Sequence, residues 1–119
     1  MTISRELWIR NLVGIARDLA DSEQQQSRWL AADAAAWERP SELLCVVLDD
    51  YQLELFLKEQ GPSLSTEQLG ATVALLQQSM EYDVGPTGWR DPEEVLGDTD
   101  WERLRQAARA FEAAFHETS

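Results

Sequence analysis

The sequence is poor in the residues that most catalytic and metal sites use. Its 119 residues include one cysteine, Cys45, and one histidine, His116. A single thiol excludes an internal disulfide, and one Cys with one His cannot supply the spaced ligands of a zinc site. His116 lies close to the last residue of the chain, where helices fray, so we do not expect it to act as a general base.

Long apolar runs are also absent. The longest, Leu43 to Leu48, is far shorter than the roughly 18 to 20 residues of a membrane-spanning helix. The first residues, "MTISRELWIRNLVG", place Glu6 and Arg10 among the apolar ones and lack the features of a secretory signal peptide. We therefore expect a cytoplasmic protein without a membrane partner, and the single cysteine agrees with a reducing compartment.

Basic residues are scarce as well. The chain has 10 Lys and Arg residues against 22 Asp and Glu residues, so its formal net charge is −12 at pH 7. A field of this sign repels phosphate backbones and steers basic partners toward the protein. No Gly-rich loop with the Lys and Ser or Thr of a phosphate site is present. We predict a basic protein as the partner, no direct nucleic-acid binding and no cofactor.

The pattern of apolar residues predicts an all-α fold. Apolar side chains recur at spacings of three and four, and capping-box sequences stand at Ser22 with Gln25 and at Ser65 with Gln68. Gly61 followed by Pro62 is a typical helix end. The expected architecture is a single domain, residues 1–119, built as a bundle of about five helices. The first helix is expected at residues 3–20, and a shorter one after Ser22 carries Trp29 and Leu30. A third helix is expected from residue 42 to the break at Gly61, a fourth at residues 65–80 and the last from Asp98 or Thr99 to Phe115, with a short helical turn at 91–97.

The helix that follows Ser41 is expected to be buried at the centre of the bundle. It is apolar without interruption from Leu43 to Leu48, and good helix formers continue to Leu55. A helix that is apolar on every side is covered by its neighbours. Cys45 lies in this run, so we predict that it is an inert core residue.

Two later helices have apolar stripes that we expect to face the core. In the first, the stripe consists of Leu69, Val73, Leu76 and Met80. In the last helix, it consists of Trp101, Leu104, Ala108, Phe111 and Phe115. Both sets repeat with the period of an α-helix, which is why we assign them to buried faces.

Asp49 and Asp50 directly follow the apolar run. Adjacent helical side chains point about 100° apart, so these two carboxylates alone cannot converge on one proton or metal ion. Two interpretations stay open. The pair marks where the helix reaches solvent, or Asp49, Asp50, Tyr51 and Glu54 form a patch that binds a partner protein. A tyrosine ring flanked by carboxylates is a common composition of interfaces.

A second acidic group lies between residues 81 and 102, which include eight acids and one basic residue, Arg90. The candidate partner-binding residues in this segment are Glu81, Tyr82, Asp83, Trp89, Asp91, Glu93 and Glu94. Trp89 is equally well explained as a ring that packs on the helices. The run "DTDWERLRQAAR" starts like a calcium loop, but Arg109 stands where the bidentate Glu is required, so we predict a helix cap there.

The order of these motifs resembles a known group of small helical bacterial proteins. The motifs are "SEQQQSRWL", "SELLCVVLDDYQL", the Gly-Pro break, "STEQLGATVALLQQ", "DPEEVL" and "DTDWERLRQAARAF". They resemble proteins that include immunity proteins of contact-dependent growth inhibition systems. This resemblance implies a cytoplasmic protein that binds one toxin domain, often a nuclease, and blocks it without catalysing a reaction.

Three functional hypotheses follow. The first is an immunity or inhibitor protein with no catalytic residues, whose acidic residues contact a basic toxin domain. The second is a helical adaptor or regulatory subunit, including a homodimer. The third is an enzyme with a carboxylate-bound divalent metal, which requires Asp49 or Asp50 to converge with acids from Glu81 to Glu102.

Overall fold

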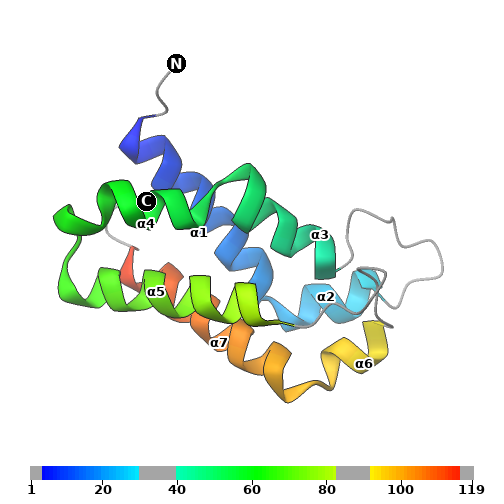
Figure 1. Cartoon of the computed structure of the whole chain (residues 1–119). Coiled ribbons are helices and arrows are strands. Elements are labelled where there is room, and N and C mark those ends of the chain that lie inside the picture. The colour runs from blue at the N-terminus through cyan, green and yellow to red at the C-terminus, as the bar shows by residue number, and fades with distance from the viewer. Residues whose placement is uncertain (1–3, 30–39, 83–91, 116–119) are drawn as a thin grey trace.

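The structure, a computed structural model, describes residues 4–29, 40–82 and 92–115 (Figure 1). Every regular element within these ranges is a helix, so the all-α prediction is confirmed. In chain order the elements are α1 (Arg5–Ala20), α2 (Ser22–Trp29), α3 (Pro40–Cys45), the π-helical η2 (Val46–Asp50), α4 (Leu53–Gln60), the 3-10 turn η3 (Gly61–Ser63), α5 (Thr66–Glu81), α6 (Pro92–Leu96) and α7 (Thr99–Ala114).

Several helix ends lie where the sequence predicts them. Ser65 and Gln68 form both hydrogen bonds of a capping box at the start of α5. Asp98 caps α7 by accepting a hydrogen bond from the backbone N–H of Asp100, at 2.9 Å. Gly61 ends α4, and Pro92 is the first residue of α6. These ends depend on local chemistry, so the sequence alone indicates them.

Two predicted caps are wrong. Helix α2 begins at Ser22 itself, and the preceding residue, Asp21, accepts a hydrogen bond from the backbone N–H of Gln24 at 3.0 Å. Helix α3 begins at Pro40, so Ser41 lies inside the helix instead of before it. In both places the residue that resembles a cap is part of the helix.

The core lies between α1, α4, α5 and α7. Helix α7 packs along both α1 and α5, and α4 packs on α5 (Figure 1). Phe56 of α4 lies at the centre, where its ring meets Trp8 at 5.3 Å and Phe115 at 6.1 Å in edge-to-face arrangements. The stripe expected to be buried in the last helix is confirmed, because Trp101, Leu104, Ala108, Phe111 and Phe115 are all buried.

The prediction of a helix covered on every side at residues 43–48 is wrong in detail. Leu44 and Val47 are buried, but Leu43, Val46 and Leu48 are only partly buried and Cys45 is exposed. The segment covers one side of α1, and the most deeply buried helices are α1 and α7. Cys45 is therefore not a core residue.

The predicted orientation of α5 is also wrong. Leu69, Val73 and Met80 are exposed and Leu76 is partly buried, whereas the positions that face the core are Thr72, Leu75 and Ser79. Helix α5 has apolar residues on two faces, and packing against α7 selects the face with smaller side chains. The hydroxyl of Ser79 is buried and has no hydrogen-bond partner among the residues that the structure describes.

A buried glutamine joins three helices. The side-chain amide of Gln25 in α2 donates to the backbone carbonyls of Asp18 and Leu19 at the end of α1, both at 2.9 Å. Its carbonyl oxygen accepts the indole N–H of Trp101 in α7, at 3.1 Å. Because Gln25 is only 3% exposed, these bonds replace the hydration that burial removes.

Candidate protein-interaction surface

The segment around Asp49 and Asp50 is a bend between two helices. The sequence predicts one helix from residue 42 to the break at Gly61, but the backbone leaves the α-helical path at Val46 and continues as the π-helical η2. Gln52 then adopts a left-handed conformation, with φ 49° and ψ 59°, and α4 begins at Leu53. Non-glycine residues rarely adopt this conformation, and π-helical turns are frequent at functional sites.

The bend has a packing reason. Val47 and Leu53 are both completely buried. In a continuous α-helix, residues six apart point about 120° away from each other, so both could not reach the same core. The π-helical turn and the left-handed Gln52 change the direction of the chain and bring Leu53 back to the core. The prediction of a single helix is therefore wrong at Gln52.

The bend is fixed to α1 by one hydrogen bond. The indole N–H of Trp8 donates to the backbone carbonyl of Tyr51 at 2.7 Å, and Trp8 is itself buried. The backbone N–H of Tyr51 donates to the carbonyl of Val46 at 2.8 Å and closes the π-helical turn. These two bonds hold the backbone that carries the acidic side chains, so the acids project from a defined position.

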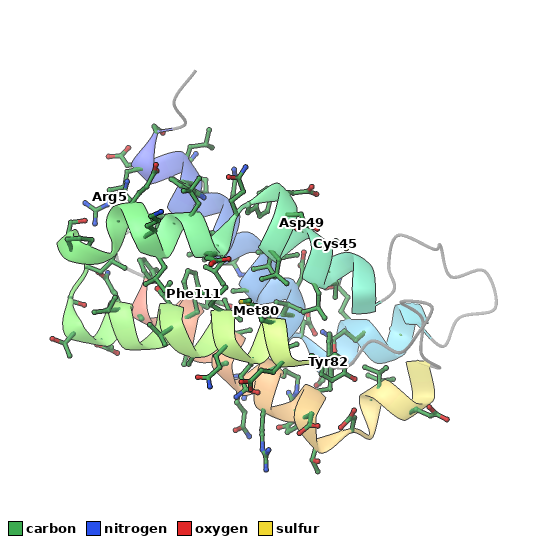
Figure 2. The ribbon with its side chains drawn as sticks, viewed as in Figure 1. Arg5, Cys45, Asp49, Met80, Tyr82 and Phe111 are labelled. Atoms are coloured by element: carbon green, nitrogen blue, oxygen red, sulfur yellow. The ribbon has the colours of Figure 1, made fainter. Side chains whose placement is uncertain are left out.

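The acidic junction, which we define as Asp49, Asp50, Tyr51 and Glu54, is largely exposed. The three carboxylates are exposed and Tyr51 is partly buried. Asp49 lies on the outer side of the bend (Figure 2). Since Gln52 interrupts the helix, Asp50 and Glu54 belong to different elements and are not one turn apart on a single helix.

Two cavities border the acidic junction. One, of about 340 Å³, is lined by Leu48, Gln52, Glu54, Leu55 and Lys58. The other, of about 510 Å³, lies between α1 and η2, and Tyr51 borders it together with Arg10, Gly14, Arg17 and Val46. The junction therefore offers carboxylates beside depressions of mixed polar and apolar lining, which suits contact with a protein side chain. Gln52, Leu48 and Lys58 were not identified from the sequence, because nothing in the sequence predicts the left-handed turn.

Of the second predicted group, the structure describes the side chains of Glu81, Tyr82 and Glu94. Glu81 and Glu94 are exposed. Tyr82 is 8% exposed, its hydroxyl donates to Asp98 at 3.2 Å, and its ring packs edge-to-face on Trp101 at 5.2 Å. Tyr82 is therefore a core residue, and its assignment to a contact surface is corrected. Asp83, Trp89 and Asp91 lie outside the described residues, as does the side chain of Glu93 in α6.

The described part of the chain offers little for metal or acid–base chemistry. No group of three or more His, Cys, Asp and Glu side chains in it could hold a metal ion. The hydrogen bond from Arg105 lowers the pKa of the Glu102 carboxyl group. Glu102 lies in the first turn of α7, where its charge also opposes the positive end of the helix.

No helix within the described ranges combines the length and the apolar character needed to cross a membrane. Comparison of the chain with protein-family models, curated proteins and solved structures gives no match. The resemblance to immunity proteins thus depends on the sequence motifs quoted above and stays a prediction.

Proposed function

We propose that this chain is an immunity-type inhibitor, a protein that binds a basic toxin domain and catalyses no reaction itself. The observation that carries the proposal is the acidic junction: Asp49, Asp50 and Glu54 are exposed on a backbone bend that Trp8 anchors. The charge of −12 supports it, because a basic toxin is steered toward such a protein.

The junction suits an inhibitor for a physical reason. A domain that grips phosphates presents Lys and Arg side chains in a cleft, and exposed carboxylates can occupy that cleft with charge-assisted hydrogen bonds. A fixed backbone lowers the conformational entropy lost on binding. The depression beside Glu54, which Leu48 and Leu55 line together with Gln52 and Lys58, offers space for a side chain of the same partner.

The test begins with capture of the partner by the tagged full chain at low and at high salt. The captured protein is then purified, its enzymatic activity is identified, and its affinity is measured for the wild type and for an Asp49→Asn, Asp50→Asn double variant. Glu6→Gln with Glu23→Gln is the matched control, because both acids are exposed on other helices and the charge change is equal.

We expect the junction variant to bind about tenfold or more weakly and to lose protection of cells that express the toxin, whereas the control keeps both. Association of the wild type should slow as salt rises. Equal affinity of the junction variant and the control would show that the junction is not the contact surface. A partner that is a housekeeping enzyme would overturn the inhibitor function.

A second function, a helical adaptor or homodimer, is favoured by a different observation. Three large apolar side chains of α5 are exposed, namely Leu69, Val73 and Met80. Exposed apolar patches on a folded domain often mark contact with another protein. Light scattering tests the homodimer: a stable homo-oligomer in the absence of any partner supports it. For a monomer, the identity of the captured partner distinguishes a toxin inhibitor from an adaptor.

A further inference from the structure

Helix α5 carries large apolar side chains on its outside as well as on the side it buries. Leu69, Val73 and Met80 are 38%, 44% and 59% exposed, whereas the buried side consists of the completely buried Leu75 and Thr72 and of Ser79. A helix on the surface of a monomer normally keeps its large apolar side chains on the buried side. The outer apolar residues therefore indicate a face that a second protein covers.

The outer face of α5 has the shape of a helix-docking surface. We define it as Leu69, Gly70, Val73, Ala74 and Met80, all of which are exposed. The three large side chains lie within about 40° of one another around the helix. Next to them, Gly70 and Ala74 are small, and a Cβ atom added to Gly70 would meet nothing within 4 Å. Small residues beside larger ones let another helix approach closely.

The charges around this face identify the class of partner. Helix α5 contains two acids, Glu67 and Glu81, and no basic residue. Both acids are exposed, and they lie roughly 21 Å apart along the helix, near its two ends. Around the helix they lie on the side of Gly70 and Ala74, and the exposed Gln77 separates that side from the stripe of Leu69, Val73 and Met80. The neighbouring α4 adds the exposed Glu54, Lys58 and Glu59, so the surroundings remain net negative. A complementary surface is apolar where it meets the stripe and basic at both ends of the Gly70 and Ala74 side.

A second copy of the chain does not meet this requirement. In an antiparallel pair of α5 helices centred on Ala74, Glu67 of one copy lies opposite Glu81 of the other at both ends. Such like-charge contacts oppose association. Two molecules of charge −12 also repel each other before contact.

We propose that the outer face of α5 binds an amphipathic helix of a partner protein, with an apolar stripe and with Lys or Arg near both ends, about four turns apart. This surface lies on another element than the acidic junction, and the inference holds whether or not the partner is a toxin. Met80 lies in the second half of α5, toward its carboxyl end (Figure 2).

The test uses the full chain and a synthetic peptide of about four to five helical turns, with Leu along one face and Lys at both ends. A scrambled peptide of equal composition, without a continuous apolar face, controls for charge. Affinity is measured by calorimetry, and the contact is mapped by amide chemical shifts of the isotope-labelled protein.

Two variants and one control are compared. Val73→Gln removes the centre of the face, and Leu7→Gln on α1 is the control, since both residues are 44% exposed and neither change alters charge. Gly70→Leu fills the face from the outside without a clash in the fold. We expect shifts along α5, about tenfold weaker binding by Val73→Gln and Gly70→Leu, and a change of less than about twofold by Leu7→Gln.

Three results would overturn the inference. If the scrambled peptide binds as tightly as the amphipathic peptide, charge alone causes the binding and the apolar face does not contribute. Binding that is lost in the Asp49→Asn, Asp50→Asn variant but kept in Val73→Gln assigns the peptide to the acidic junction. A homodimer in light scattering that Val73→Gln dissociates assigns the face to a second copy.

Discussion

The substitution Gln25→Met tests whether a single buried amide holds α1, α2 and α7 together. Methionine has nearly the same length as glutamine and fills the site, so the change removes hydrogen bonds with little loss of packing. The amide is 3% exposed, and water cannot easily replace it.

The expected loss follows from the three bonds. The carbonyls of Asp18 and Leu19 each lose a donor, and the indole N–H of Trp101 loses its acceptor. A net hydrogen bond contributes about 0.5 to 1.5 kcal/mol, and a buried polar group left unpaired costs about 1 to 3 kcal/mol. Some relaxation is expected near the end of α1, so we predict a loss of about 2 to 4 kcal/mol in the free energy of unfolding.

Urea unfolding monitored by tryptophan fluorescence and by circular dichroism measures this loss. The midpoint should fall by about 1 to 2 M urea with an unchanged slope. Gln24→Met is the matched control, because no side-chain hydrogen bond joins the neighbouring Gln24 to other described residues, and its effect should stay within about 0.5 kcal/mol. Equal midpoints for the two variants would refute the role of the buried amide.

Ser79→Ala should raise the free energy of unfolding by about 1 kcal/mol, because it removes a buried hydroxyl without a partner among the described residues. Thr72→Val should lower the free energy of unfolding, because the hydroxyl of Thr72 donates a hydrogen bond to the backbone carbonyl of Gln68. Thermal unfolding distinguishes the two signs. The bond from Arg105 lowers the pKa of Glu102 from its ordinary 4.5, so its stabilisation is present above that pH and lost as the pH falls through the folded value. Glu102→Gln should therefore slightly weaken the fall of the melting temperature as the pH is lowered below 4.5. The same dependence of melting temperature on pH in the variant and the wild type would contradict this.

Much of the fold could be predicted from local sequence. The capping box of Ser65 and Gln68, the end at Gly61 and the start of α6 at Pro92 depend on residues that are neighbours in the chain. The stripe of α7 was predicted correctly because its opposite side is polar, so only one face can be buried. The exposed carboxylates of the acidic junction also follow from their charge.

Other features depend on contacts between distant residues. Gln25 reads as part of a capping box, but its partner Trp101 comes from the other end of the chain. The bend at Gln52 forms because Val47 and Leu53 must both reach the core, and its anchor, Trp8, lies in α1. The sequence indicates Tyr82 as a surface aromatic, but in the structure its ring packs on Trp101 and its hydroxyl donates a hydrogen bond to Asp98.

By itself, the sequence determined that the protein is helical, strongly acidic and poor in catalytic side chains, because propensity, charge and composition belong to single residues and their neighbours. Only the tertiary structure decided which side of α5 faces the core and where the acids project. Helix α5 is apolar on two faces, and a helical period cannot choose between them. Packing against α7 made that choice and left Leu69, Val73 and Met80 exposed.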